Sequence, residues 1–151
     1  MSEKRIYDNI TNEYIELTEP KYGWASFIFK KNKCIDYPMS YVDNVPLMLI
    51  DVCIEKLNNP DKPVCIKFDA EGYNWYLILD TNEVVFVDRN KTRKGLYDTF
   101  AFIELIIDHL EENDKQWRDF VYDLYDYDEI QARLSELKTL YKNKLSTYLP
   151  Y

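Results

Sequence analysis

The clearest pattern along the chain is an alternation of apolar and polar residues that begins at position 64. Val64, Ile66 and Phe68 alternate with Cys65 and Lys67, and apolar runs then cover 73–79 and 84–87. Short polar segments, 70–72 and 80–83, separate these runs. Because strands joined by such short turns pair with their neighbours in opposite directions, this region predicts a three-stranded antiparallel meander.

The N-terminal part of the chain predicts further strands. Residues 14–18 form a short run with apolar and β-branched side chains, and 20–23 interrupt it with proline and glycine. Segments 24–29 and 34–37 flank the polar residues 30–33, which is the pattern of a β-hairpin.

Two segments predict helices that are apolar on most sides. Residues 45–57 and 100–110 contain few charged side chains, which is typical of helices buried on more than one face. Pro46 suits the first turn of the earlier helix. Residues able to cap the two N-termini are Asp43 or Asn44 and Asp98 or Thr99.

The last third of the chain predicts two amphipathic helices. Spacings of three and four residues place Trp117, Phe120, Val121 and Leu124 on one face of a short helix. Asp128 can cap a final helix, with Gln131 placed for the reciprocal bond of a capping box. The apolar stripe of that helix would consist of Ile130, Leu134, Leu137, Tyr141, Leu145 and Tyr148.

These elements predict an α+β fold in one domain covering residues 1–151. The expected architecture is an antiparallel sheet, made of the central three-stranded meander and the N-terminal hairpin, packed against four helices. A chain of 151 residues is the size of one ordinary domain.

The balance of charge argues against binding to nucleic acid. Asp and Glu number 27 against 19 Lys and Arg, so the formal net charge is −8, whereas neutralising phosphates requires a basic surface. The basic stretch at 89–95 is interpreted as a solvated polar connection. An acidic surface instead favours a basic protein as partner, because complementary potentials accelerate encounter.

The cysteines and apolar stretches predict a cytoplasmic protein. The three cysteines, Cys34, Cys53 and Cys65, show no CxxC spacing, so neither a disulfide framework nor a zinc site is expected. Cys53 and Cys65 lie within apolar runs and are interpreted as small core residues. Neither a secretion signal nor an apolar stretch long enough to span a membrane is seen.

The most informative feature is the run 122–129, in which tyrosines alternate with carboxylates and which leads into the last predicted helix. A tyrosine offers a stiff, partly apolar surface with a hydroxyl, and a carboxylate pairs with cations. Either some of these residues pack inward and cap a helix while the rest are solvated, or they form a surface that binds a basic protein. We take the second interpretation as the prediction. The predicted partner-binding residues are Tyr122, Asp123, Tyr125, Asp126, Tyr127 and Glu129, joined by an upstream acidic group of Asp108, Glu111 and Glu112.

No catalytic residue, metal site or cofactor is predicted. The one histidine, His109, lacks a partner nucleophile in any recognisable motif, and at a helix end its charged form would interact favourably with the helix dipole. Acids in the strand turns could hold Mg²⁺ or Ca²⁺, but their spacing matches no EF-hand loop. They are interpreted as solvated turn residues. The three tryptophans are interpreted as core or core-edge residues, with Trp75 as the candidate surface anchor.

Small, acidic, tyrosine-rich α+β domains without catalytic motifs resemble bacterial immunity proteins, the antidotes of contact-dependent inhibition and other polymorphic toxin systems. The resemblance rests on the composition of the whole chain, which includes 14 tyrosines. It implies a one-to-one complex in which the chain covers the active site of a toxin domain, and it transfers no residue roles.

The expected function is therefore that of a binding protein, an immunity protein that blocks a basic toxin such as a nuclease. Two alternatives remain open from the sequence. One is a regulatory or scaffold module, including an acidic mimic of nucleic acid. The other is an enzyme that uses scattered carboxylates and a metal ion.

Overall fold

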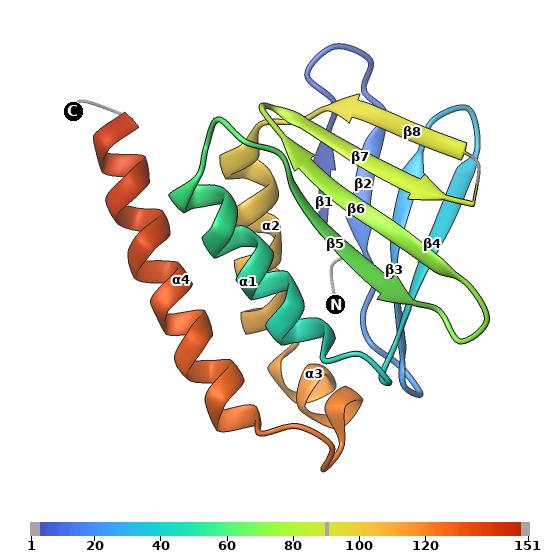
Figure 1. Cartoon of the computed structure of the whole chain (residues 1–151), viewed down its shortest axis with the longest axis vertical. Coiled ribbons are helices and arrows are strands. Elements are labelled where there is room, and N and C mark those ends of the chain that lie inside the picture. Colours follow the sequence, from blue (N-terminus) through green and yellow to red (C-terminus); the bar gives the residue numbers. More distant parts are fainter. Residues whose placement is uncertain (1–3, 90, 149–151) are drawn as a thin grey trace.

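The structure is a computed structural model that describes residues 4–89 and 91–148. Within these residues the chain forms two four-stranded antiparallel sheets and four helices (Figure 1). The predicted α+β class is confirmed. The sheet layout differs from the prediction, because the hairpin and the meander belong to two separate sheets instead of one.

The first sheet contains the predicted strand and hairpin of the N-terminal region, together with one strand that was not predicted. Arg5 in that extra strand donates from Nε to Oε1 of Glu16 at 2.6 Å, which links it to its neighbour. Its four residues are too few to show a periodic pattern. In spatial order the strands are β1 (Lys4–Tyr7), β2 (Tyr14–Leu17), β3 (Trp24–Lys30) and β4 (Cys34–Ser40).

The second sheet contains the predicted meander and a fourth strand where a polar connection was predicted. Its strands are β5 (Val64–Asp69), β6 (Asn74–Asp80), β7 (Glu83–Asp88) and β8 (Lys91–Leu96). The prediction for 89–95 was wrong because β8 is an edge strand. Such a strand can carry lysines at most positions, since only one of its sides is paired. Lys94 lies 3.8 Å from Glu83, so cross-strand charges also hold β8 to β7.

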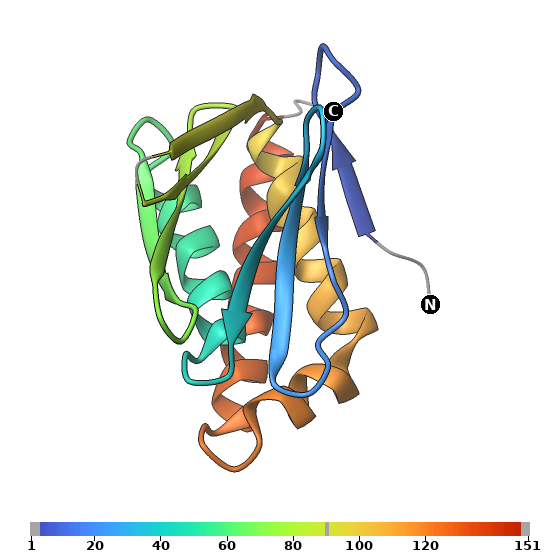
Figure 2. The same cartoon turned by 90° about the vertical axis from the view of Figure 1, so that its right-hand side faces the viewer.

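The inner faces of the two sheets meet in an aromatic core. The rings of Tyr37 and Phe86, one from each sheet, stack with centroids 4.4 Å apart. Trp75 is fully buried and its indole nitrogen donates to the carbonyl oxygen of Pro38 at 2.6 Å. Trp75 is therefore not a surface anchor. Figure 2 shows the two sheets in front and the helices behind them.

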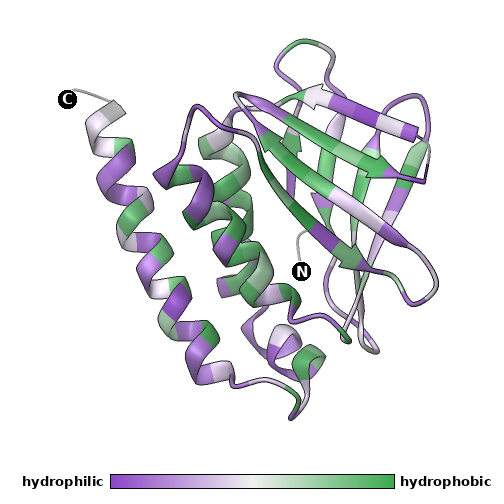
Figure 3. Ribbon diagram, viewed as in Figure 1, coloured by the Kyte–Doolittle hydropathy of each residue, from purple (hydrophilic) through white to green (hydrophobic). Residues whose placement is uncertain are grey.

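The helices form a layer beside the sheets (Figure 1). They are α1 (Val45–Asn58), α2 (Thr99–Glu112), α3 (Asp114–Val121) and α4 (Tyr127–Tyr148). The helix α4 packs against α1 and α2, and Phe102 of α2 stacks on Phe27 of β3. Figure 3 shows that apolar residues dominate α1 and α2, whereas α4 is largely hydrophilic. Among the described residues, no helix has both the length and the apolar character needed to cross a membrane.

Two of the predicted helix caps are present. The side chain of Asn44 accepts a hydrogen bond from the backbone nitrogen of Leu47, and that of Asp98 accepts one from Phe100. Each bond satisfies one of the unpaired N–H groups at a helix start.

The third helix is shorter than the sequence pattern predicted. Trp117, Phe120 and Val121 are buried as expected, but Leu124 lies beyond the helix and is 57% exposed. The helix ends because Tyr122 adopts φ 53° and ψ −138°, which takes the chain out of the helical region.

The last helix begins differently from the prediction. Its cap is Asp126, whose Oδ1 accepts hydrogen bonds from the backbone nitrogens of Asp128 at 3.0 Å and Glu129 at 3.4 Å. Gln131 instead reaches Oδ1 of Asp114 on α3. The prediction that Cys65 is a small core residue was also wrong, because Cys65 lies on the exposed face of β5.

Candidate protein-binding surface

Three connecting segments meet at one end of the molecule, and we call residues 18–24, 41–44 and 122–126 the loop end (Figures 1 and 2). The backbone nitrogen of Tyr41 donates to the carbonyl oxygen of Gly23 at 3.0 Å. The hydroxyl of Tyr125 donates to the carbonyl oxygen of Val42 at 2.7 Å. The rings of Tyr41 and Tyr122 lie edge to face, 6.2 Å apart. These contacts join the three segments into one surface.

Exposed apolar side chains gather on the loop end. It carries five of the nine large hydrophobic side chains that are exposed among the described residues: Tyr22, Trp24, Val42, Tyr122 and Leu124. Tyr22 is 91% exposed and Tyr122 is 68% exposed. Single exposed hydrophobic residues are normal, whereas a group of them marks a surface suited to a partner.

Tyr22 is held in a backbone conformation that favours other residue types. Lys21 and Trp24 exchange two backbone hydrogen bonds of 2.8 and 3.0 Å around the pair Tyr22 and Gly23. Tyr22 has φ 54° and Gly23 has φ 79°, and positive φ at both central residues is the signature of a type I′ hairpin turn. A Cβ on Gly23 would lie 2.9 Å from Tyr41, so glycine is required there. Asn, Asp or Gly is preferred where this chain has Tyr22.

Tyr122 shows the same disagreement between backbone and side chain. Its φ of 53° and ψ of −138° belong to a region that glycine ordinarily occupies. Positive φ costs an ordinary residue about 1–2 kcal/mol. Two exposed tyrosines thus occupy positions where the fold alone would favour a smaller residue. Such strain is found preferentially at functional sites.

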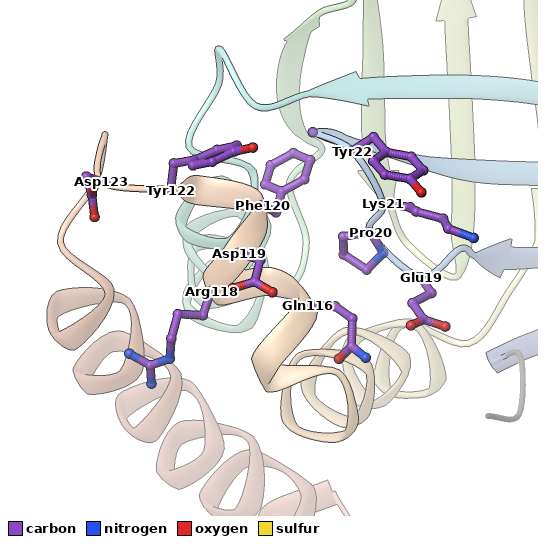
Figure 4. A pocket seen from close by; sticks show the side chains of 11 residues that line it. Glu19, Pro20, Lys21, Tyr22, Gln116, Arg118, Asp119, Phe120, Tyr122 and Asp123 are labelled. Carbon is purple, nitrogen blue, oxygen red and sulfur yellow. The ribbon is translucent and has the colours of Figure 1, made fainter.

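A groove of about 740 Å³ lies between the first of these segments and helix α3 (Figure 4). Pro20 and the largely buried Phe120 belong to its lining, and the exposed side chains of Tyr22 and Tyr122 flank it. Carboxylates, an amide and two cations complete the lining: Glu19, Lys21, Gln116, Arg118, Asp119 and Asp123.

Carboxylates surround the exposed aromatic rings. Asp43 accepts a hydrogen bond from the backbone nitrogen of Asp69 at 2.7 Å, which fixes the turn between β5 and β6 against the loop end, and burial raises the pKa of the Asp43 carboxyl. Glu71 in that turn accepts a hydrogen bond from the hydroxyl of Ser40. The acids at or beside the loop end are Glu19, Asp43, Asp69, Glu71, Asp119, Asp123 and Asp126.

The structure divides the predicted tyrosine and carboxylate run into an outer and an inner part. Tyr122 and Asp123 line the groove, whereas Tyr125 is half-buried. Asp126 caps α4. Tyr127 is only 8% exposed, and its hydroxyl donates to Oδ1 of Asp114 at 3.0 Å. Burial raises its pKa, which keeps the phenol neutral. The remaining member, Glu129, is exposed on the first turn of α4.

The upstream acidic group is paired with lysines of the same chain. Nζ of Lys4 lies 3.1 Å from Glu112 and 4.0 Å from Asp108, and Nζ of Lys138 lies 2.5 Å from Glu111. In the described part of the chain, no hydrogen bond or ion pair of these three acids reaches residues 122–129. Their charge is therefore partly neutralised before any partner arrives.

His109 is a buried, neutral residue, not a charged helix end. It is 2% exposed, and its Nδ1 accepts a hydrogen bond from the indole nitrogen of Trp117 at 3.0 Å. Burial lowers its pKa from 6.5 to about 4. The prediction that a charged His109 ring interacts with the helix dipole was therefore wrong. Among the described residues, no group of three or more His, Cys, Asp and Glu side chains is arranged to hold a metal ion.

Sequence reasoning missed the part of this surface that lies before residue 25. Tyr22 comes from the segment 20–23, which was interpreted only as an interruption between strands, and neither Glu19 nor Asp119 was singled out. The available signal was Tyr22 followed by Gly23 between two strands, where a two-residue turn would normally begin with Asn or Asp.

Comparison with known proteins found no family model, curated protein or solved structure that matches this chain.

Proposed function

We propose that this chain is a binding protein that holds a basic protein domain against its loop end. The observation that carries the proposal is the group of exposed aromatic side chains surrounded by carboxylates. The formal net charge of −8 supports a cationic partner, because long-range attraction increases the rate of productive encounter.

The rings and the carboxylates would contribute in different ways. Tyrosines at the centre of an interface bury a large area at a small entropic cost and exclude water from neighbouring charge pairs. An ion pair at an exposed rim contributes about 0–1 kcal/mol, whereas a close, desolvated pair contributes more. The aromatic patch would therefore supply most of the affinity, and the carboxylates most of the selectivity for a basic surface.

The partner that fits this chemistry best is a toxin domain with a basic active site, such as a nuclease. The chain would neutralise it as an immunity protein does, by covering the site and placing carboxylates where substrate phosphates would bind. Tyr22, Tyr122 and Leu124 would be the anchors, with Asp123 and Glu19 beside them.

The first test identifies the partner and its effect. The chain is used as bait in its source cells with chemical cross-linking, and the captured protein is then expressed in a bacterial host with and without the chain. We expect a basic protein that stops growth when it is expressed alone, and growth restored by co-expression. A captured partner that is acidic, or that leaves growth unchanged, would contradict the proposal.

The second test asks whether the loop end is the surface used. The triple variant Tyr22→Ala, Tyr122→Ala, Leu124→Ala should lose the rescue of growth and weaken binding at least 100-fold, since each anchor typically contributes about 2–4 kcal/mol. The control replaces three exposed hydrophobic residues outside the loop end, Tyr7, Ile10 and Tyr76, by alanine. Unchanged binding by the loop-end variant, or an equal loss in the control, would rule this surface out.

A further inference from the structure

The groove beside Tyr22 has free carboxylates on both of its walls. Glu19 comes from the segment between β2 and β3, and Asp119 comes from helix α3 (Figure 4). Asp123 lies at the far end of the same lining. In the described part of the chain, neither a hydrogen bond nor an ion pair engages these three carboxylates, unlike Glu16 and Asp51, which are paired with arginines.

In the described residues, neither cation of the lining, Lys21 or Arg118, forms an ion pair with Glu19, Asp119 or Asp123. Arg118 pairs with Asp114 at 3.8 Å and its guanidinium lies 4.3 Å from the centre of the Tyr127 ring. Figure 4 shows it pointing away from Asp119 and Glu19. Nζ of Lys21 lies 5.9 Å from the centre of the Tyr22 ring, and Figure 4 shows this side chain extending away from α3 and Asp119.

The remaining walls suit a long cationic side chain. The exposed rings of Tyr22 and Tyr122 offer apolar surface for methylene groups and faces on which a planar cation can stack, whereas Phe120, at 2% exposed, is largely covered. A guanidinium stacks on aromatic rings and donates two parallel hydrogen bonds to a carboxylate, whereas an ammonium cannot do both.

We propose that this groove receives an arginine side chain of the basic partner, held between Glu19 and Asp119 and covered by the two tyrosine rings. The inference rests on the proposed function, and it names the group that the loop end selects. A groove of about 740 Å³ exceeds the volume of one side chain, so it also has room for the backbone on either side of the arginine.

The test is a titration with a blocked hexaarginine peptide, followed by two-dimensional ¹H–¹⁵N NMR. We expect chemical-shift changes concentrated in residues 19–23 and 116–123, and binding at least fivefold weaker to hexalysine. The variant E19Q/D119N should weaken hexaarginine binding at least tenfold. The control E55Q/D61N changes charge equally, at the opposite end of α1 (Figure 1), and should bind as the unmodified chain does.

Several results would overturn the inference. They are shifts spread over the whole acidic surface, equal binding of both peptides, or equal losses in the two charge variants. The captured partner then separates this inference from the proposed function. If the loop-end alanine variant loses the partner but E19Q/D119N retains it, the loop end binds without the arginine site. If neither variant loses the partner, the proposed function is wrong as well.

Discussion

Tyr22 and Tyr122 show at the scale of single residues how binding and folding place different demands on one position. Each has a positive φ that disfavours tyrosine, and each exposes most of its side chain. Among the described residues, the one aromatic or cation–π contact of the Tyr22 ring is with Lys21, and the side chain is 91% exposed. It therefore contributes little to the stability of the folded state. The cost of about 1–2 kcal/mol for its backbone is therefore not offset within the chain.

Replacing Tyr22 by asparagine should separate the two demands. Asparagine is favoured in a type I′ turn before glycine, so Tyr22→Asn should raise the free energy of unfolding by about 0.5–1 kcal/mol while it weakens binding of the captured partner. Urea denaturation measures the first effect and calorimetric titration the second. Tyr76→Asn in strand β6 is the control, which should lower stability because asparagine is disfavoured in strands. A destabilised Tyr22→Asn would show that the ring supports the fold.

The buried histidine gives the chain a dependence of stability on pH. The pKa of His109 is about 4 in the folded chain, against 6.5 when exposed. Between these values the unfolded chain binds a proton that the folded chain does not. The contribution of neutral His109 to the free energy of unfolding is therefore fully present above pH 6.5. It is lost as the pH drops towards 4, and the total loss is up to about 3 kcal/mol.

Urea denaturation between pH 7 and pH 5 measures this loss. The variant His109→Gln cannot take up the proton, so its stability should change much less over the same range. An equal slope in both proteins would show that other groups cause the effect.

At the scale of elements, the start of helix α4 decides which tyrosines of the run 122–129 are exposed at the loop end. The start of α4 follows from Asp126, which takes two backbone hydrogen bonds and so turns the chain between Tyr125 and Tyr127. Tyr125 contacts the segment at 41–44, and Tyr127 packs against α3. The cap therefore sets which rings of the run face solvent.

Removing this cap should cost more than removing the acid two residues later. Asp126→Ala should lower the free energy of unfolding by about 1 kcal/mol, whereas Asp128→Ala should cost less than about 0.5 kcal/mol. Asp126→Ser retains a capping oxygen without the charge, so it should keep stability and isolate the contribution of the carboxylate to binding. If Asp128→Ala were the more destabilising change, the cap predicted from sequence would be the right one.

At the scale of the whole molecule, the distribution of charge decides which surface can attract a partner. Asp108, Glu111 and Glu112 of α2 are paired with Lys4 and Lys138, whereas no ion pair within the described residues engages the loop-end acids Glu19, Asp119 and Asp123. The formal net charge alone does not distinguish these surfaces. Intramolecular pairing does, because a carboxylate already holding a lysine gains less from a second cation.

Association with the captured partner should therefore depend strongly on salt. Raising the ionic strength from 0.05 to 0.5 M should slow association at least tenfold and change dissociation much less, because screening acts on the long-range attraction. Stopped-flow fluorescence at several salt concentrations measures both rates. An association rate that does not depend on salt would contradict electrostatic attraction by this surface.

The sequence alone determined the local elements whose signals are contained in a few neighbouring residues. The meander from Val64, the hairpin after Trp24 and the positions of two helix starts are of this kind, because periodicity, turn residues and capping oxygens act over short distances along the chain. The sequence narrowed each cap to two neighbouring residues, and the structure selects Asn44 and Asp98. The α+β class follows from their order.

Only the tertiary structure decided which polar residues become an edge strand, which tyrosines are exposed and which carboxylates remain free. Lys91 to Leu96 is a strand because β7 pairs with it, and Tyr127 is buried because α3 covers it. Tyr22 and Tyr122 flank one groove although 100 positions separate them. Such outcomes depend on contacts between residues far apart in the chain, and no local pattern specifies them.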